Sequence, residues 1–381
     1  MDNEVFAYLL TFLFTVLLTD YLRRHALQAG LVDRPGARKR HVGAIPPVGG
    51  EAIFAGCLLS ALAVGVSADA VLALFAIGGI VLLVGALDDY MSFSPLSRLA
   101  AQTAAATAMA VAGGGTIGHL DGLLHSGELI SLGILAIPLT VIATVAVINA
   151  FNLIDGMDGL SGGLALVALL GLATMASLSG AADVVVLALI LASGTAAFLA
   201  LNIHSPWRWR ASVFLGDSGS TFLGFALSWL IIQVSQDPAT PMSPAVGLWF
   251  LMVPLFDATY VALRRMAQGR SPFVADRQHL HHFFLRAGLP VGYTLAILLA
   301  LAVLGAAAGV TGAMLGLGDG ALIGAFGLLF ALYAAVMTRA WKRHPQLRRA
   351  VRRHRQCASI APVIARARAV PGNDWLEESR P

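Results

Sequence analysis

The basic residues of this sequence lie only in alternate loops between a regular series of long apolar runs, and after the last run. These runs recur between residues 5 and 333, and hydrophobic residues make up 57% of the chain. Such an asymmetry is typical of proteins that cross a membrane many times, because their cytoplasmic loops collect Lys and Arg. It therefore indicates which loops face the cytoplasm. All 25 Lys and Arg residues lie between alternate runs or after the last one, within 23–40, at 98, and within 208–210, 264–286 and 339–380.

The apolar runs predict an all-α, polytopic transmembrane bundle of about eleven spanning helices, since one span needs about 20 apolar residues. The fourth run is Ala-rich and the fifth contains Pro138, so ten crossings are the alternative. Asp2 and Glu4 precede the first run, which we interpret as a retained span with the N-terminus outside. Eleven crossings then leave the C-terminus in the cytoplasm. The runs are 4–22, 48–67, 70–87, 97–113, 132–151, 159–179, 183–202, 217–235, 244–263, 289–310 and 319–338.

This pattern predicts a single membrane domain over residues 1–338 and a basic cytoplasmic tail over 339–381. The polar stretch 341–355 is typical of an amphipathic helix on the membrane surface. Cys57 and Cys357 lie far apart and predict neither a disulfide nor a metal cluster. The basic residues lie in the cytoplasmic loops and the tail, where attraction to anionic membrane lipids explains them without any nucleic acid.

Two adjacent carboxylates, Asp88 and Asp89, end the third apolar run. Adjacent charges at a membrane boundary repel each other, and a cation would relieve that repulsion. Mg²⁺ is bound by one or two carboxylates together with substrate phosphates, which suits this pair. The alternative is a solvated helix end.

The segment NAFNLIDGMDGL carries a polar residue at every third position. On a helix or a tight turn this spacing places two amides and two carboxylates along one strip. Gly156 and Gly159 loosen the backbone beside them. A helix-capping turn between two spans is the alternative, but it needs fewer polar groups. The strip consists of Asn149, Asn152, Asp155 and Asp158.

Three further polar patches lie in the predicted cytoplasmic loops. In VFLGDSGST, Asp217 opens an apolar helix, where it either caps the helix or binds phosphate together with its glycine and serine neighbours. DRQHLHHF carries three His residues, which predict either Zn²⁺ or phosphate binding, without an obvious complete zinc ligand set. The basic arm 38–41 leads into the Gly-rich start of a helix. Together these patches predict a site that joins a soluble phosphorylated donor to a lipid.

Four segments resemble the polyprenyl-phosphate N-acetylhexosamine-1-phosphate transferases, the family that includes MraY, TagO and WecA. They occur in the order of that family and span roughly residues 30–290. The form DRQHLHH is most similar to the WecA type, which transfers N-acetylglucosamine-1-phosphate from UDP-GlcNAc to undecaprenyl phosphate. The segments are LDDYMSFSPLSR, NAFNLIDGMDGLSGG, VFLGDSGSTFLGF and PFVADRQHLHHFFLRAG.

The resemblance implies a role for each matching residue. Asp217 would be the main Mg²⁺ ligand, with Asp88 and Asp89 beside the metal and the lipid phosphate, one of them as a possible base. His281 and His282 would contact the diphosphate or the sugar. Arg40 and His279 would bind the lipid phosphate or the diphosphate. The residues implied in nucleotide binding are Asn152, Asp155, Asp158 and Phe214.

The resemblance also implies Mg²⁺, or Mn²⁺ in its place, as cofactor, a multi-pass location in the bacterial cytoplasmic (inner) membrane, and a homodimer as one oligomeric state. Asn202 lies upstream of Asp217 across a longer loop than in MraY, which leaves its alignment open. Another UDP-N-acetylhexosamine donor is the nearest alternative function. A transporter is a more distant one, because transport favours ionisable groups in the middle of the spans. A scaffold protein for lipid-linked glycans would not need five aspartates together.

Overall fold

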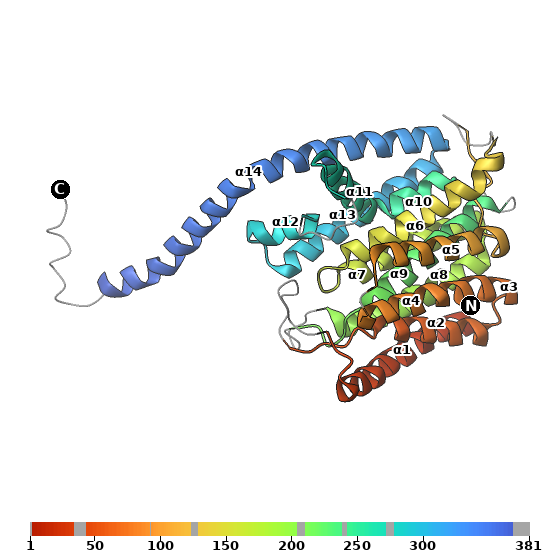
Figure 1. Ribbon diagram of the computed structural model, residues 1–381, viewed down its shortest axis with the longest axis horizontal. Coiled ribbons are helices and arrows are strands. Elements are labelled where there is room, and N and C mark those ends of the chain that lie inside the picture. The colour runs from red at the N-terminus through yellow and green to blue at the C-terminus, as the bar shows by residue number, and fades with distance from the viewer. Residues whose placement is uncertain are drawn as a thin grey trace.

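The structure, a computed structural model, is helical almost throughout and forms one bundle (Figure 1). It describes residues 2–33, 43–91, 93–122, 129–203, 210–237, 242–271 and 278–368, with side chains up to residue 343. The predicted all-α class agrees with this architecture. A two-stranded antiparallel ribbon in the described part of the chain, β1 (His119–Leu120) with β2 (Ile130–Ser131), was not predicted.

The first half of the bundle runs from the N-terminus to the turn after the sixth α-helix. Its elements are α1 (Asp2–Ala29), α2 (Gly49–Val64), α3 (Ala68–Val71), the π-helical turn η1 (Leu72–Ile77), α4 (Gly78–Met91), α5 (Pro95–Ala112), the 3₁₀ turn η2 (Gly133–Leu135) and α6 (Ala136–Ile154). The second half contains α7 (Leu160–Ser179), α8 (Ala182–Asn202), α9 (Gly216–Gln236), α10 (Pro244–Phe250), α11 (Met252–Ala267), α12 (Leu280–Ala287), α13 (Val291–Met314) and α14 (Asp319–Arg368).

Helix α9 is the centre of the bundle. It packs against α2, α4, α6 and α7, and 94% of the residues in its most apolar stretch are buried. By contrast, α1 and α14 lie at opposite edges of the bundle (Figure 1) and expose leucines such as Leu17 and Leu328. Exposed apolar side chains on peripheral helices are expected where lipid rather than water surrounds the protein.

Glycines bring the neighbouring helices close to the start of α9. A Cβ on Gly85 of α4 would lie 2.6 Å from the backbone of Asp217, and one on Gly50 of α2 would lie 2.3 Å from the backbone nitrogen of Gly219. Small residues allow such close backbone contact between membrane helices. The end of α4, which carries two carboxylates, therefore lies directly against the first turn of α9.

Each of the eleven predicted apolar runs is helical, but the run 244–263 is divided between α10 and α11, and fewer helices are long and apolar enough to cross a membrane. Within the described residues, eight are long and apolar enough to cross a membrane, or nine if the bent pair α10–α11 counts as one. That pair bends by 81°. Pro254 is a physical reason for the break, because a proline clashes with the carbonyl four residues earlier, here that of Phe250. The number eleven and the orientation of the termini stay predictions.

The C-terminal helix differs from the expected outline. It continues from Asp319 to Arg368 as one helix of 50 residues, without a break at residue 338. Its second half extends away from the bundle (Figure 1). The division into a membrane domain and a tail stays a prediction, and residues 369–381 lie outside the described part of the chain.

Candidate active site

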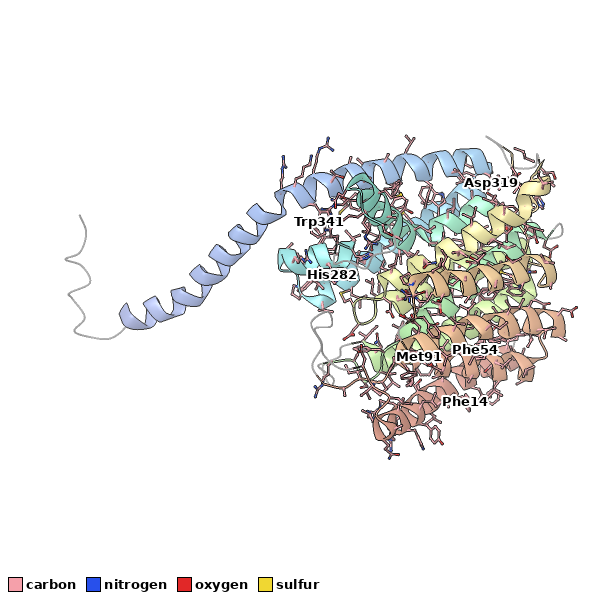
Figure 2. The ribbon with its side chains drawn as sticks, in the orientation of Figure 1. Phe14, Phe54, Met91, His282, Asp319 and Trp341 are labelled. Atoms are coloured by element: carbon pink, nitrogen blue, oxygen red, sulfur yellow. The ribbon has the colours of Figure 1, made fainter. Side chains whose placement is uncertain are left out.

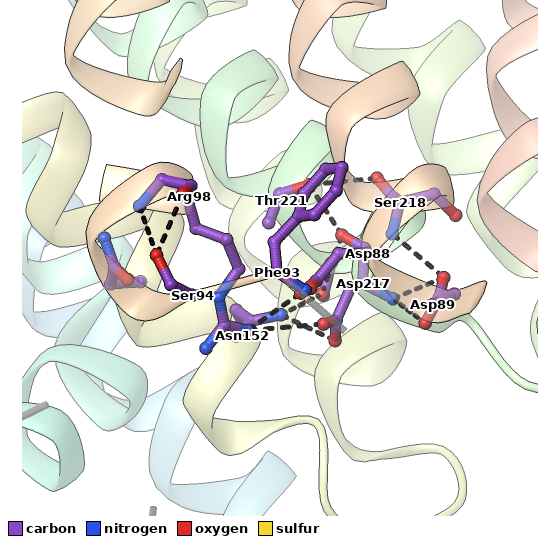
Figure 3. A network of polar contacts seen from close by, with 12 residues as sticks. Asp88, Asp89, Phe93, Ser94, Arg98, Asn152, Asp217, Ser218 and Thr221 are labelled. Atoms are coloured by element: carbon purple, nitrogen blue, oxygen red, sulfur yellow. Dashed lines mark hydrogen bonds and ion pairs between the residues drawn. The ribbon is translucent and has the colours of Figure 1, made fainter. Parts of the chain in front are cut away.

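The first turn of α9 is capped by a carboxylate from another helix. Gly216 has a positive φ of 78° and precedes Asp217. The carboxylate oxygens of Asp89, on α4, accept the backbone N–H of Asp217 at 3.1 and 3.0 Å and that of Ser218 at 3.5 Å (Figure 3). A carboxylate at a helix N-terminus satisfies unpaired N–H groups and the helix dipole. Because Asp89 supplies the cap, the side chain of Asp217 is available for other contacts.

One arginine joins two of the predicted site carboxylates. Nη1 of Arg98 lies 3.0 Å from Oδ2 of Asp88 and 3.5 Å from Oδ2 of Asp217 (Figure 3). The other oxygen of Asp88 accepts the backbone N–H of Phe93 at 2.6 Å. Arg98 lies in the first turn of α5, whose start is fixed by Ser94, the N-cap residue that accepts the N–H of Ser97 at 3.1 Å. No role was assigned to Arg98 from the sequence, although this residue is the last one of the segment LDDYMSFSPLSR.

Helix α6 adds amide groups to the same centre. Nδ2 of Asn152 donates to Oδ1 of Asp217 at 2.9 Å and to Oγ of Ser220 at 3.2 Å. One turn earlier, Nδ2 of Asn149 donates to Oε1 of Gln102 at 2.6 Å. Carboxylates, a guanidinium and amides thus meet where α4, α5, α6 and α9 come together. The pocket at this point is lined by polar side chains from all four helices, namely Asp88, Arg98, Gln102, Asn149, Asn152, Asp217 and Thr221.

The turn after α6 holds the two remaining aspartates of the predicted strip. Asp155 ends the helix and is half-buried. Its pKa lies well above the usual range of a carboxyl group, first because burial disfavours the charged form and then because the charges of Asp217, Asp89 and Asp158 repel it. The first half of the predicted strip therefore lies on a helix and the second half in a turn. Asp155 is close enough to the carboxylate centre for its charges to raise the pKa of Asp155.

Asn202 links this turn to the segment that leads into α9. Its Oδ1 accepts the N–H of Gly159 at 2.6 Å, and its Nδ2 donates to the carbonyl of Val213 at 2.9 Å. Asn202 is buried, so both bonds are shielded from water. Asn202, whose alignment the sequence left open, therefore connects the turn at Gly159 to the segment that begins at Val213.

The predicted histidines lie on and just before α12. His281 is 1% exposed, and neither of its ring nitrogens has a hydrogen-bond partner among the described residues. A Cβ on Gly156 would lie 2.6 Å from its Nε2, so the ring packs directly on the turn that carries Asp155 and Asp158. Its pKa is lowered well below the usual value, first by burial and then by the neighbouring His282 and His279. His282 is only partly buried, and its ring centroid lies 4.1 Å from that of His281.

His279 has a different environment from the other two histidines. Its Nδ1 lies 2.9 Å from Oδ2 of Asp257, and the other oxygen of that carboxylate accepts the N–H of Leu280 at 2.8 Å. Asp257 lies on α11 and is 1% exposed. It therefore fixes both the His279 ring and the start of α12. Sequence reasoning missed Asp257, which is one acidic residue within an apolar run.

Phe214 and Arg40 are the remaining residues to which the family resemblance gave a role. The backbone of Phe214 donates to the carbonyl of Pro46 at 2.9 Å and accepts the N–H of Gly49 at 3.0 Å, which holds the start of α2 beside the start of α9. Arg40 lies outside the described residues.

The carboxylate centre suits a hard divalent cation, although the protein ligands are few. Within the described residues, no group of three or more His, Cys, Asp or Glu side chains is arranged to hold a metal. Asp88 and Asp217 already share a positive group, the guanidinium of Arg98. Mg²⁺ is usually bound by one or two carboxylates and completed by substrate phosphates and water. The oxygen donors present fit that kind of site.

The fold and the site define a multi-pass membrane protein with an acidic, phosphate-compatible centre at the helix ends. A model of glycosyl transferase family 4 matches residues 71–235. Curated relatives match almost the whole chain and are named undecaprenyl-phosphate alpha-N-acetylglucosaminyl 1-phosphate transferase. The protein of Escherichia coli strain K12 is 34% identical over 356 residues, which cover 93% of this chain and 96% of that protein. The protein of Haemophilus influenzae is 35% identical over 347 residues, covering 90% and 96%.

The protein of Pasteurella multocida is similar to the same degree, at 35% identity over 346 residues, which cover 91% of this chain and 96% of that protein. The chain therefore belongs to glycosyl transferase family 4. The resemblance that the four sequence segments indicated is thereby confirmed.

Proposed function

We propose that this protein transfers N-acetylglucosamine-1-phosphate from UDP-GlcNAc to undecaprenyl phosphate and releases UMP. The relatives that match nearly the full chain carry a name for this reaction. The structural observation that supports it best is that the guanidinium of Arg98 pairs with both Asp88 and Asp217. Asn152 donates a hydrogen bond to Asp217 as well. Such a centre can hold a cation and face several phosphate oxygens. The product would be the lipid-linked first sugar of a cell-surface polysaccharide.

The reaction joins two anions. An oxygen of the lipid phosphate forms a bond to the β-phosphorus of the donor. The bond from that phosphorus to the oxygen bridging the α-phosphorus breaks, and its electron pair leaves with UMP. Bound Mg²⁺, or Mn²⁺, would neutralise the diphosphate so that a second phosphate can approach. We propose Asp217 and Asp88 as the residues that hold it.

The other residues of the centre would orient the reactants. Lipid phosphate is largely ionised near neutral pH, so a strong base is not essential. The oxygens of Asp89 accept backbone N–H groups, which favours a positioning role over that of a base. Arg98 is half-exposed and can pair with phosphate oxygens as well as carboxylates.

We propose that the turn after α6 and the histidines bind the sugar nucleotide. Asp155 and Asp158, with Asn152 and Phe214, would serve the nucleotide. The ring nitrogens of His281, which are buried and have no hydrogen-bond partner among the described residues, would hydrogen-bond the diphosphate or the sugar, with His282 beside it. In the same proposal, Arg40 and His279 serve the phosphates of the lipid or the donor, and Asp257 holds His279 in place.

The test is an assay of UMP release by the purified protein with undecaprenyl phosphate, Mg²⁺ and a panel of UDP-sugars. We expect turnover with UDP-GlcNAc that needs both the lipid and the metal. Turnover only with another UDP-N-acetylhexosamine would replace the donor and keep the reaction class. No UMP release with any donor would contradict the proposal.

We further propose that the site faces the cytoplasm of a bacterium, at its inner membrane, because Lys and Arg collect in the loops on that side. Single cysteines placed beside Asp88, Asp155 and His281 should react with a membrane-impermeant reagent only after the cells are opened. Labelling in intact cells would contradict this orientation. The homodimer stays a prediction.

A further inference from the structure

A hydrogen bond between two side-chain amides joins α5 to α6 one helical turn away from the carboxylate centre. Nδ2 of Asn149, on α6, donates to Oε1 of Gln102, on α5, at 2.6 Å. Asn149 is the first residue of the polar strip, and the proposed function gives it no role. Gln102 is 6% exposed and lies within the Ala-rich fourth apolar run. Buried polar groups in such a run are costly and are commonly retained for function, so this pair is a candidate for a functional role.

The amide of Asn149 is held in one orientation. Its Nδ2 also donates to the carbonyl of Val145 at 2.8 Å, within the same helix. Both N–H groups of this amide therefore have an acceptor, one on its own helix and one on α5. A hydrogen bond of this kind between helices adds to their association in a membrane protein. The pair is thus a rigid connection between α5 and α6.

The same two helices hold the carboxylate of Asp217 from both sides. Oδ1 of Asp217 accepts from Asn152 of α6 at 2.9 Å, and Oδ2 lies 3.5 Å from Nη1 of Arg98 of α5 (Figure 3). Residues three or four apart share one face of a helix. Asn152 therefore lies one turn after Asn149 on α6, and Arg98 lies one turn before Gln102 on α5. All of these side chains line one pocket.

We propose that Gln102, through its hydrogen bond to Asn149, is a positioning residue for the Asp217 carboxylate. The bond sets the separation of α5 and α6, and this separation decides whether Asn152 and Arg98 can contact the two oxygens of Asp217 at the same time. Catalytic rates depend on placement to within about 1 Å. The inference rests on the proposed function, because it concerns the same centre.

A second glutamine provides a matched comparison. Gln233 lies near the end of α9, where its Nε2 donates to the carbonyl of Gly114 at 3.2 Å. The loop after Gly114 continues to Asp121, whose N–H donates to Asp319. Figure 2 shows Asp319 at the end of the bundle opposite His282. The bond of Gln233 is therefore a similar interaction far from the carboxylate centre.

The test begins with Gln102→Met, which keeps the size of the side chain and removes the acceptor. UMP release is measured on the purified full-length protein in detergent, with undecaprenyl phosphate, UDP-GlcNAc and Mg²⁺. We expect kcat to fall about tenfold or more, with a KM for UDP-GlcNAc within about twofold of the wild-type value, because the change disturbs the reacting centre and not the turn after α6. Gln233→Met should keep the wild-type kcat, and the unfolding midpoints of the two variants should agree.

A rescue experiment tests whether Gln102 acts through Asn149. Gln102→Asn shortens the side chain by one methylene and should lower kcat in the same way. Adding Asn149→Gln restores the combined length of the pair, so the double variant should recover most of the lost kcat. This comparison decides the matter even if Gln102→Met does not fold.

Three outcomes would overturn the inference and leave the proposed function intact. They are an unchanged kcat in Gln102→Met, a double variant no more active than Gln102→Asn, and a fall in kcat accompanied by an unfolding midpoint well below that of Gln233→Met. The last would show that Gln102 only stabilises the bundle. A wild-type protein that releases no UMP with any UDP-sugar would overturn the proposed function and this inference together.

Discussion

The carboxylate of Asp257 accepts from two groups of one neighbouring segment, the Nδ1 of His279 at 2.9 Å and the N–H of Leu280 at 2.8 Å. Asp257, His279 and Leu280 are all buried, so the start of α12 depends on a single side chain of α11. We expect Asp257→Ala to leave two buried groups unpaired, at about 1–3 kcal/mol each. Thermal unfolding of the detergent-solubilised protein should show the loss.

Asp257→Asn separates positioning from a general loss of folding. The amide oxygen can still accept the N–H of Leu280, so much of the stability should return. If Asp257 acts by placing the histidines, the KM for the UDP-sugar should rise more than the KM for undecaprenyl phosphate. Equal changes in both values would contradict a role through α12.

Asp217→Asn should abolish most of the activity and leave folding nearly intact. The substitution removes a charge from a hard oxygen ligand, and we expect a fall in kcat/KM of at least about a hundredfold, or about 2.7 kcal/mol. Folding should survive, because Asp89 rather than Asp217 caps α9. Steady-state UMP release at limiting Mg²⁺ measures the first effect, and the unfolding midpoint measures the second.

The matched control is Asp89→Ala, which removes the cap and keeps the predicted metal ligands. It should lower the free energy of unfolding by about 1–2 kcal/mol. Near-normal turnover of Asp217→Asn at limiting Mg²⁺ would show that this residue is not the main ligand.

Gly156→Ala tests whether the turn and the histidine act together. The new Cβ would lie 2.6 Å from Nε2 of His281 and 3.0 Å from its Cε1, so the ring must move. The φ of Gly156 is not positive, so alanine adds no backbone strain there. We expect a fall in kcat/KM of about tenfold or more, or about 1.4 kcal/mol. Gly292→Ala, where no atom lies within 4 Å of the new Cβ, should leave the activity unchanged. If both variants are equally active, the contact has no functional role.

His281 should make the protein less stable in mild acid. Burial lowers its pKa well below the usual value of 6.5, so the unfolded chain binds a proton in a range where the folded chain does not. The folded state therefore loses stability as the pH falls from about 6.5 towards the lowered pKa, by up to about 1.4 kcal/mol per pH unit. Above 6.5 this contribution is constant.

The measurement is the unfolding midpoint between pH 7.5 and 5 for the wild type and His281→Asn. The variant should have the flatter profile over this range, because it lacks the titrating group. Parallel profiles would show that another group causes the loss in acid.

The four motifs could be identified from the sequence because they are local patterns of unusual residues in an apolar chain. Asp88 and Asp89 at the end of a run, and Asn152 within a run of polar residues at every third position, are conspicuous where water-soluble groups are costly. The long apolar runs likewise predicted the helices, since a backbone in lipid must satisfy its own hydrogen bonds.

The tertiary structure decided how these residues divide the work. Arg98 and Asp257 are single charges, and tertiary structure brings each to a distant partner. Arg98 on α5 meets Asp217, which is 119 residues away, and Asp257 on α11 meets His279, which is 22 residues away. The cap of α9 likewise comes from Asp89, which is far from it in sequence. Local spacing determines which side chains share a helix face. Contacts between helices depend on close packing at glycines such as Gly50 and Gly85, and only the folded bundle fixes that packing.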